Sequence, residues 1–487
     1  MKKMPPGTIA IIALILTAAA QVRAESPAIG LRALNGDKYF DPGVAALPSL
    51  GQSSDSVAPT QRESDDRAAN LGLQDSTLGQ DADTASANSQ PSCRRGDRGR
   101  PIRYEKVASY PTPASVRAYF DEWIAFYQDF YQFPPNIPVE FDYGFDSYKV
   151  TYCTIDAMLP GQSSAHPTIA TGMVSVPRKA GPLPTVAYLH GTSVSFYDAV
   201  SNPHIFGEFN EGGESFDGPP SNAVFAGAGF IYVAPDYLGL GNSTVPRHRY
   251  FHAATEASSA VDLLAATREL LADLHVERND ELFIFGFSQG GHAALALHRK
   301  LQKMDVSVTG TATVGGVFDV EQWFLMSLAN KTTLTLPLYV SYILLAYDDI
   351  YDVYEQPSDV FRRPYAASVG ELFDMQHYFD DVLAGLPPNS RALLKPSYYA
   401  GVTENPQNPL RVRLRQNAVD RWSPYAPLRI YHSPDDEEVP YADALVSVER
   451  LRSRGADVTV RRLSNFDHVN SWVQAMPRAA KWFRSLD

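Results

Sequence analysis

The sequence predicts an α/β fold: a mostly parallel central sheet flanked by helices. From residue 185 onward, short apolar runs typical of buried strands alternate with helical stretches, as in parallel sheets that helices cover. A Gly-x-Ser-x-Gly motif at residues 286–290 lies between one such strand and the helix after it. Residues 319–417 interrupt the alternation with helical, aromatic-rich segments, which predicts a helical cap insertion over the ligand-binding end of the sheet.

The first predicted element is an amphipathic helix over residues 114–131, where Tyr119, Trp123 and Phe126 recur at three- and four-residue spacing. The segments predicted as strands are residues 148–155, 168–176, 185–190, 230–234, 282–285, 306–317, 429–432 and 458–463. The helices predicted between them are residues 253–274, 289–304 and 441–454. The first strands have no helices between them, so we expect an antiparallel edge there.

The N-terminus has the pattern of a secretory signal peptide over residues 1–24. Lys2 and Lys3 precede an apolar run over residues 9–20, and small residues end at Ala24, where a signal peptidase would cut. A membrane anchor is the alternative, but it needs about 20 apolar residues and this run is shorter. The pattern therefore predicts a secreted or periplasmic protein.

Residues 25–100 are rich in Ser, Asp, Gln, Ala and Gly and bury too little apolar surface to order themselves. We expect a disordered arm or propeptide, whose basic end at residues 94–100 is a solvated charge run or a processing site. The folded core would then comprise residues 101–318 and 418–487, with the cap over 319–417.

The cysteines, the net charge and the absence of known binding motifs limit which cross-links, partners and cofactors the protein can have. Export permits a disulfide between Cys93 and Cys153. It would close a loop of about 60 residues and stabilise the fold by about 4 kcal/mol, although two buried free thiols are the alternative.

The net charge of −13 argues against nucleic acid as a partner. No dinucleotide, P-loop or HExxH motif occurs, and we expect neither cofactor nor metal. His248, His252 and Glu256 have helical spacing that could hold a metal, but a helix surface near its start is the better explanation.

Ser288 is the candidate nucleophile. A sharp strand-to-helix turn raises its hydroxyl above the sheet and sets it at a helix N-terminus, where backbone N–H groups stabilise an oxyanion. The alternative is an idle serine on a glycine-rich turn. A serine nucleophile needs a base and a carboxylate that orients the base. Asp436 and His468 lie in loops after the two last predicted strands, in the order Ser, acid, His.

Several motifs resemble those of the α/β-hydrolases, most closely the bacterial and fungal secretory lipases and esterases. In that group an Asp is separated by two residues from Val-Pro, as Asp436 is here, and a late His lies in a polar loop, as His468 does. Residues 188–192 match its His-Gly-Thr turn, and residues 235–241 match its Pro-Asp-Tyr-x-Gly-x-Gly turn. The resemblance runs from residue 185 to the C-terminus, leaves residues 25–100 unmatched and implies the α/β-hydrolase fold.

The resemblance also implies a role for each residue. Ser288 would attack an ester carbonyl, His468 would move the proton, and Asp436 would orient the imidazole. The backbone N–H groups of Gln289 and of Thr192 or Gly191 would bind the oxyanion. Three neighbours of Asp436 are also acidic and would form a similar surface turn: Asp435, Glu437 and Glu438. His190 and Asp236 are expected to support loops.

These inferences predict an exported serine hydrolase of carboxylic esters, acting on small-molecule or lipid esters and most simply on acyl lipids. We expect transient contact with a lipid surface at most, and no stable partner. The same triad also serves peptidases, thioesterases and acyltransferases, so a serine peptidase or acyltransferase is the enzymatic alternative. A non-catalytic binding module on a hydrolase scaffold is the alternative from another class, but such modules usually lack a triad residue.

Overall fold

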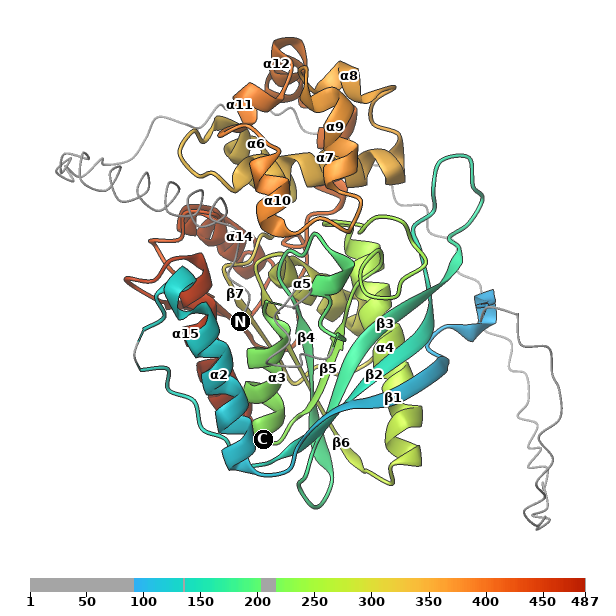
Figure 1. The fold of residues 1–487 in the computed structure, drawn as a ribbon, viewed down its shortest axis with the longest axis vertical. Helices are drawn as coiled ribbons and strands as arrows, with labels where there is room; N and C mark the ends of the chain where they lie inside the picture. Colours follow the sequence, from blue (N-terminus) through green and yellow to red (C-terminus); the bar gives the residue numbers. More distant parts are fainter. Residues whose placement is uncertain (1–91, 135, 203–215, 487) are drawn as a thin grey trace, which may run out of the picture. The chain divides into compact units, whose positions relative to one another are not determined.

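A computed structural model describes residues 92–134, 136–202 and 216–486 (Figure 1). Within these residues the strands form one nine-stranded sheet in the order β1-β2-β3-β5-β4-β6-β7-β8-β9. The strands are β1 (Pro101–Tyr110), β2 (Phe145–Ile155), β3 (Pro167–Pro177), β4 (Leu183–Leu189), β5 (Ile231–Pro235), β6 (Arg278–Phe287), β7 (Gly310–Val314), β8 (Leu428–His432) and β9 (Val458–Arg462). The expected α/β class is confirmed.

The sheet has an antiparallel edge and a parallel body, as the sequence predicts. Strands β1, β2, β3 and β5 pair antiparallel in that order, whereas β5, β4, β6, β7, β8 and β9 pair parallel. The edge strand β1 is the strand that the sequence did not predict. It contains Arg103, Glu105 and Lys106 and is only partly buried, so it lacks the apolar run by which the inner strands were recognised.

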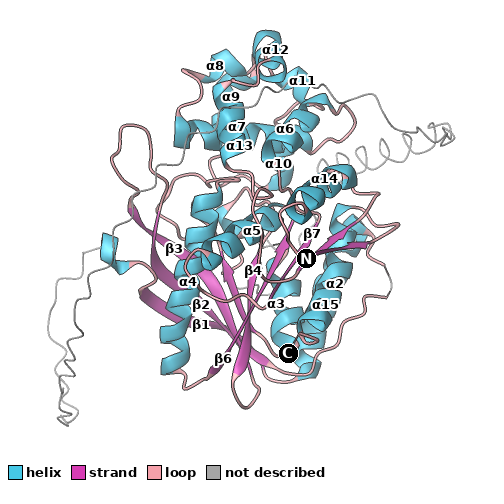
Figure 2. Cartoon of the chain, turned by 180° about the vertical axis from the view of Figure 1, so that it is seen from behind, coloured by secondary structure: helices cyan, strands magenta, loops and turns pink. Residues whose placement is uncertain are grey.

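Helices cover both faces of the sheet (Figure 2). Helices α2 (Pro113–Tyr131), α3 (Gly218–Gly227) and α15 (His468–Phe483) share one apolar core with the sheet. The other face carries α4 (Ala253–Asp273), α5 (Gln289–Gln302) and α14 (Tyr441–Arg452). Such two-sided coverage explains why the central strands β4, β5 and β7 are buried along their whole length.

Eight further helices lie between β7 and β8 within the described residues, over the stretch expected to form the cap (Figure 1). They are α6 (Val320–Ala329), α7 (Leu336–Tyr351), α8 (Pro357–Val360), α9 (Tyr365–Leu372), α10 (Phe379–Ala384), α11 (Ser390–Leu393), α12 (Pro396–Glu404) and α13 (Pro409–Gln416). We call them the helical insertion. Helix α7 contacts the loops that follow β4 and β5, because Tyr342 donates to the Ser193 carbonyl at 3.1 Å and Tyr347 to that of Phe251 at 3.0 Å. The insertion thus packs at the carboxyl ends of these strands.

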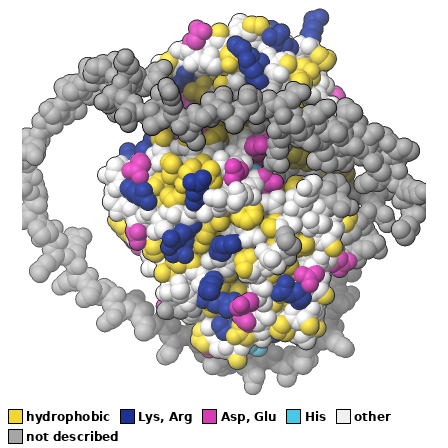
Figure 3. Space-filling view, turned by 90° about the vertical axis from the view of Figure 1, so that its left-hand side faces the viewer, with side chains coloured by type: hydrophobic (Ala, Val, Ile, Leu, Met, Phe, Trp, Pro, Cys, Tyr) yellow, Lys and Arg dark blue, Asp and Glu magenta, His cyan; other side chains and the backbone are white. Residues whose placement is uncertain are grey.

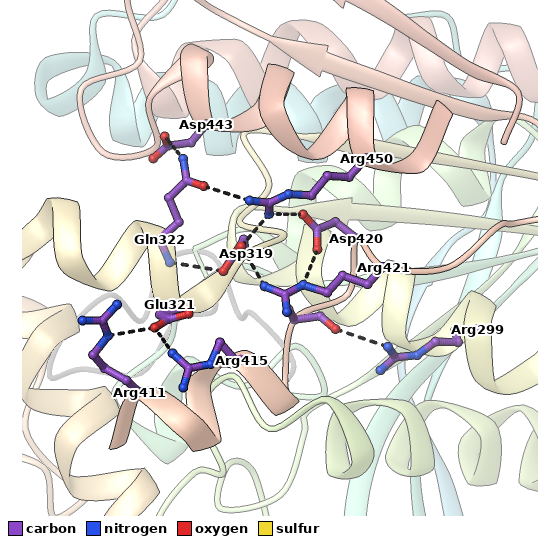
Figure 4. Close-up of polar contacts among 11 residues, drawn as sticks. Arg299, Asp319, Glu321, Gln322, Arg411, Arg415, Asp420, Arg421, Asp443 and Arg450 are labelled. Atoms are coloured by element: carbon purple, nitrogen blue, oxygen red, sulfur yellow. Dashed lines mark hydrogen bonds and ion pairs between the residues drawn. The ribbon is translucent and has the colours of Figure 1, made fainter. Parts of the chain in front are cut away.

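Ion pairs join the two ends of the helical insertion to the core (Figure 4). Arg450 of α14 bonds Asp319, where the insertion begins, at 2.5 Å, and Asp420, just beyond its end, at 2.8 Å. Arg421 also reaches Asp319, at 3.3 Å. Inside the insertion, Glu321 pairs with Arg411 at 2.8 Å, as Figure 4 also shows. Asp319 and Asp420 are almost fully buried, so these charges need their partners.

The folded region extends further toward the N-terminus than residue 101, where we expected it to begin. Cys93 and Cys153 form a disulfide, and the Gly99 N–H donates to the Cys153 carbonyl at 2.9 Å. Arg98 forms an ion pair with Asp262 at 3.1 Å. A cross-link and polar contacts therefore order residues 92–100, which have too little apolar surface to do so by burial. The expected signal peptide over residues 1–24, and the expected arm from residue 25 to 91, lie outside the described residues.

The surface of the described chain shows no segregation of charge on the face drawn in Figure 3, where acidic, basic and apolar side chains are interspersed. Among the helices that the structure describes, none combines the length and the apolar character needed to cross a membrane.

Candidate active site

The turn at Ser288 joins β6 to α5 with a strained backbone. Ser288 has φ +54° and ψ −119°, a conformation that costs a non-glycine residue about 1–3 kcal/mol and is retained where function requires it. Its N–H donates to the Val314 carbonyl of β7 at 3.0 Å, which ties the turn to the neighbouring strand. The serine is half-buried at the N-terminus of α5. The hydroxyl is thus presented at the carboxyl end of the sheet.

The glycines of the motif are required by close backbone approach. A Cβ atom on Gly286 would lie 2.0 Å from the Gly290 carbonyl oxygen, and one on Gly290 would lie 1.9 Å from the Leu189 carbonyl oxygen. Any side chain at either position would therefore push α5 away from β6 or from the end of β4. The motif places α5 directly against the loop that begins at His190.

His468 and Asp436 are brought together by the ends of β8 and β9. Asp436 follows β8, and His468 is the first residue of α15. The His468 Nδ1 atom lies 2.7 Å from Asp436 Oδ2, and both side chains are buried. The other Asp436 oxygen accepts the N–H groups of Glu438 at 3.0 Å and Val439 at 2.9 Å. Asp436 is thus held rigidly as the partner of Nδ1.

The contact between Asp436 and His468 shifts the pKa of both side chains. Burial alone would raise the pKa of Asp436, but the adjacent His468 and the bonds to the carboxylate hold it below its usual value. Burial lowers the pKa of His468, but the nearby carboxylates, Asp436 first and then Glu438 and Asp467, more than offset this effect and raise that pKa to about 9. The site therefore stabilises an imidazolium, the form that a general base reaches after it takes a proton.

The backbone at residues 314 and 315 lies next to both Ser288 and His468. Ser288 bonds Val314, and a Cβ atom on the next residue, Gly315, would lie 2.9 Å from His468 Cε1. The ring of Phe287, which precedes the serine, is 5.0 Å from the imidazole. The buried His468 Nε2 atom has no hydrogen-bond partner among the residues that the structure describes. With Nδ1–H directed to Asp436, Nε2 is the nitrogen available to accept a proton.

The backbone N–H groups expected to bind the oxyanion differ in whether they already donate a hydrogen bond within the protein. The Gly191 N–H donates to Asp217 Oδ2 at 2.6 Å and is therefore occupied. No such acceptor is recorded, in the described part of the chain, for the N–H of Gln289 or of Thr192. The Thr192 side chain bonds the Tyr250 hydroxyl at 2.8 Å, which fixes this loop. Of the expected alternatives, Thr192 is therefore the better donor, and Asp217 is a supporting residue that the sequence did not reveal.

The other acidic and histidine candidates have structural partners. Asp435 accepts the Asn465 N–H at 2.8 Å and is exposed, so it does not face the imidazole. Asp236 is fully buried and accepts hydrogen bonds from Thr171 and Ser201, each at 2.5 Å, which supports the turn after β5 as expected. His190 bonds two backbone carbonyls and stacks on a tyrosine ring.

A buried polar network supports the start of α5. Glu256 of α4 accepts from Gln289 Nε2 at 3.0 Å and lies 2.6 Å from His292 Nδ1. Gln289 also donates to His248 Nε2 at 2.7 Å, and His292 Nε2 donates to the Asn417 carbonyl at 2.8 Å. Burial opposes ionisation of Glu256, but His292 and Gln289 hold its pKa below the usual value. These partners explain the helical spacing of His248 and Glu256 without a metal.

We expect Glu256→Ala to lower the free energy of unfolding by about 3–5 kcal/mol. The substitution would leave the buried His292 and Gln289 without their acceptor, and uncompensated buried polar groups are costly. Urea unfolding followed by circular dichroism measures the change. Glu269→Ala on the exposed face of the same helix is the matched control, and we expect it to stay within about 0.5 kcal/mol of the wild type. Equal changes in the two variants would contradict this role for Glu256.

Among the described residues, no three His, Cys, Asp or Glu side chains are grouped so that they could hold a metal ion. His252 bonds Thr255 at 3.0 Å instead, and burial lowers its pKa to about 4.

Comparison with known proteins relates the chain to hydrolases through its structure. No family model and no curated protein matches the sequence. A putative hydrolase from Legionella pneumophila superposes with a TM-score of 0.68 at 24% identity, over 79% of this chain and 98% of that one. The rice cell wall degrading esterase LipA from Xanthomonas oryzae gives 0.66 at 24% identity, over 80% and 97%. Candida antarctica lipase A in its closed state gives 0.54 at 16% identity, over 77% and 79%. The chain therefore has the α/β-hydrolase fold.

Proposed function

We propose that the protein is a serine hydrolase that cleaves carboxylic esters through Ser288, His468 and Asp436. The observation that carries this proposal is the buried His468, whose Nδ1 atom lies 2.7 Å from Asp436 and whose Nε2 atom has no hydrogen-bond partner among the described residues. Ser288 occupies the strained turn after β6, and the ring of the preceding Phe287 lies 5.0 Å from the His468 imidazole. A nucleophile, a base and an orienting acid are the groups that acyl transfer requires. The esterase and lipase neighbours support a hydrolase function.

The proposed reaction proceeds in two steps. His468 Nε2 takes the proton from Ser288 as Oγ attacks the ester carbonyl, and the N–H groups of Gln289 and Thr192 bind the oxyanion. The tetrahedral intermediate expels the alcohol, which receives the proton from Nε2, and an acyl-enzyme remains. Water, deprotonated by His468, then attacks the acyl-enzyme, and the second tetrahedral intermediate releases the acid as Nε2 returns the proton to Ser288 Oγ. Asp436 stays ionised throughout and stabilises the imidazolium. The reaction needs no cofactor.

The acyl group of the substrate is proposed to be apolar. The loops around the candidate site and helix α7 meet through aromatic rings: Tyr250 stacks on Tyr342 with ring centroids 4.4 Å apart, and Phe373 packs on Tyr342 at 4.9 Å. These rings are buried, so they make the region around the site apolar without forming an open surface, and the proposal of an apolar acyl group is supported mainly by the esterase and lipase neighbours. We therefore propose small-molecule or lipid esters, and acyl lipids in particular. The signal-peptide pattern over residues 1–24 supports an exported enzyme.

A serine-directed fluorophosphonate probe tests the proposal without knowledge of the natural substrate. We expect the purified protein to gain the mass of one phosphonyl group on the peptide that contains Ser288, and to hydrolyse p-nitrophenyl esters. Ser288→Ala should remain unlabelled, whereas the exposed Ser464→Ala should be labelled like the wild type. The dependence of turnover on acyl length would then separate an esterase from a lipase. Folded protein that neither reacts with the probe nor turns over any ester would overturn the proposal.

A further inference from the structure

A second carboxylate approaches the proton-transferring nitrogen of His468. Glu438 Oε2 lies 3.8 Å from His468 Nε2, whereas Asp436 contacts the other ring nitrogen, Nδ1. The Glu438 side chain is only 21% exposed. Asp436 accounts for Nδ1, so this second carboxylate is not required to orient the imidazole. Its position next to Nε2 needs a separate explanation.

Glu438 is held in place by the helical insertion. Thr335, which precedes α7, donates to Glu438 Oε1 at 3.1 Å, and Tyr339 of α7 donates to Oε2 at 2.8 Å. Trp323 of α6 donates its ring N–H to the Glu438 backbone carbonyl at 2.9 Å. The oxygen that faces His468 is therefore the one that Tyr339 bonds. A displacement of α7 would remove two hydrogen bonds from this carboxylate.

The charges around His468 come from three elements. Asp436 and Glu438 lie in the loop after β8, and Asp467 is the N-cap residue of α15, immediately before the histidine. His432, at the end of β8, lies 3.5 Å from Asp436 Oδ2, but burial lowers its pKa and it is neutral at ordinary pH. Asp467 is engaged by the Asn470 N–H at 2.7 Å. Glu438 is thus the carboxylate that faces Nε2.

We propose that Glu438 is a positioning residue that links helix α7 to the protonation state of His468. This inference rests on the proposed function, because it assigns His468 the part of the general base. A carboxylate beside Nε2 stabilises the imidazolium and so makes the free enzyme harder to deprotonate. Tyr339 and Thr335 fix that carboxylate, so any movement of α7 as substrate enters changes the basicity of His468. The helical insertion therefore acts on the chemistry as well as covering the site.

The pH dependence of kcat/KM tests the electrostatic part. Activity requires neutral His468, so kcat/KM rises with pH as the imidazolium loses its proton. We expect Glu438→Gln to move this rise to lower pH by about one unit, because it removes a negative charge close to Nε2. Glu437→Gln is the matched control: it makes the same change of charge one residue away, on an exposed side chain, and should move the rise far less. Equal shifts in the two variants would overturn the proposal.

A double-mutant cycle tests the link to α7. Tyr339→Phe removes the hydroxyl that bonds Glu438, and we expect it to shift the pH profile in the wild-type background. In the Glu438→Gln background the same substitution should leave the profile unchanged, since the charge that Tyr339 fixes is then absent. Tyr339→Phe shifts of the same size in both backgrounds, or none in the wild type, would show that α7 does not act through Glu438.

Nuclear magnetic resonance separates this inference from the proposed function. The His468 imidazole is titrated directly in protein labelled at histidine, and its signal is assigned by its loss in His468→Gln. We expect the His468 pKa to be lower in Glu438→Gln than in the wild type, whether or not any ester is hydrolysed. A lower His468 pKa in Glu438→Gln, in a protein without esterase activity, would contradict the proposed function but not the role of Glu438. An unchanged His468 pKa in an active esterase would contradict the role of Glu438 alone.

Discussion

Ser288→Ala and His468→Ala are each expected to lower kcat for ester hydrolysis by about 10⁵- to 10⁶-fold, with little change in KM. Alanine at residue 288 removes the nucleophile, and alanine at residue 468 leaves the serine hydroxyl without a base. Residues that act as one unit lose nearly all of their effect when any one is removed. The activity that remains should come from the oxyanion donors and from binding alone. Steady-state kinetics on the best p-nitrophenyl ester gives both parameters.

A variant that carries both substitutions shows whether Ser288 and His468 act together in one catalytic step or independently. We expect Ser288→Ala/His468→Ala to be no slower than either single variant, since the second substitution has nothing left to remove. Ser464→Ala and His166→Ala, both exposed, are the controls and should retain wild-type activity. Thermal unfolding by circular dichroism shows that each variant is folded. A variant with His468→Ala that keeps a tenth of wild-type activity would exclude His468 as the base.

The parts of the site that were predictable follow local rules. A strained serine between a strand and a helix has a sequence signature, because Gly286 and Gly290 are needed where backbones touch. The candidate acid and base were predicted from their order along the chain and from their place after strands, and the fold brings these two side chains into contact. Residues that support the site from distant parts of the chain have no such signature. Asp217 and Glu256 became recognisable only when the fold brought them to Gly191 and Gln289.

The fold was predictable to a similar extent, for similar reasons. The inner strands are apolar because helices cover both faces, and this made them visible in the sequence. The edge strand β1 is half polar and was missed. Helix α3 was missed too: it begins with Gly218 and carries two prolines in its first turn, and it is buried all round, so it has no amphipathic stripe to detect. The order of residues 92–100 depends on a disulfide partner 60 residues away.

Asp436→Asn is expected to lower kcat by about 10⁴-fold while the protein keeps its fold. An asparagine amide is nearly isosteric with the carboxylate, but its NH₂ group can donate to His468 Nδ1 and so favour the tautomer that carries its proton on Nε2. The imidazole would then have no lone pair at the nitrogen that must accept the serine proton. The loss should appear in kcat more than in KM, because orientation of the base matters in the transition state and little in substrate binding.

The neighbouring Asp435→Asn is the matched control for Asp436→Asn. Asp435 is exposed and accepts only a backbone N–H in the described structure, from Asn465 at 2.8 Å, and an asparagine oxygen can accept the same bond. We expect this variant to retain activity within about threefold of the wild type. Asp436→Asn should also move the rise of kcat/KM to lower pH, because Asp436 is the main cause of the raised His468 pKa. A large loss of kcat in Asp435→Asn with a small loss in Asp436→Asn would identify Asp435 as the acid and contradict the role proposed for Asp436.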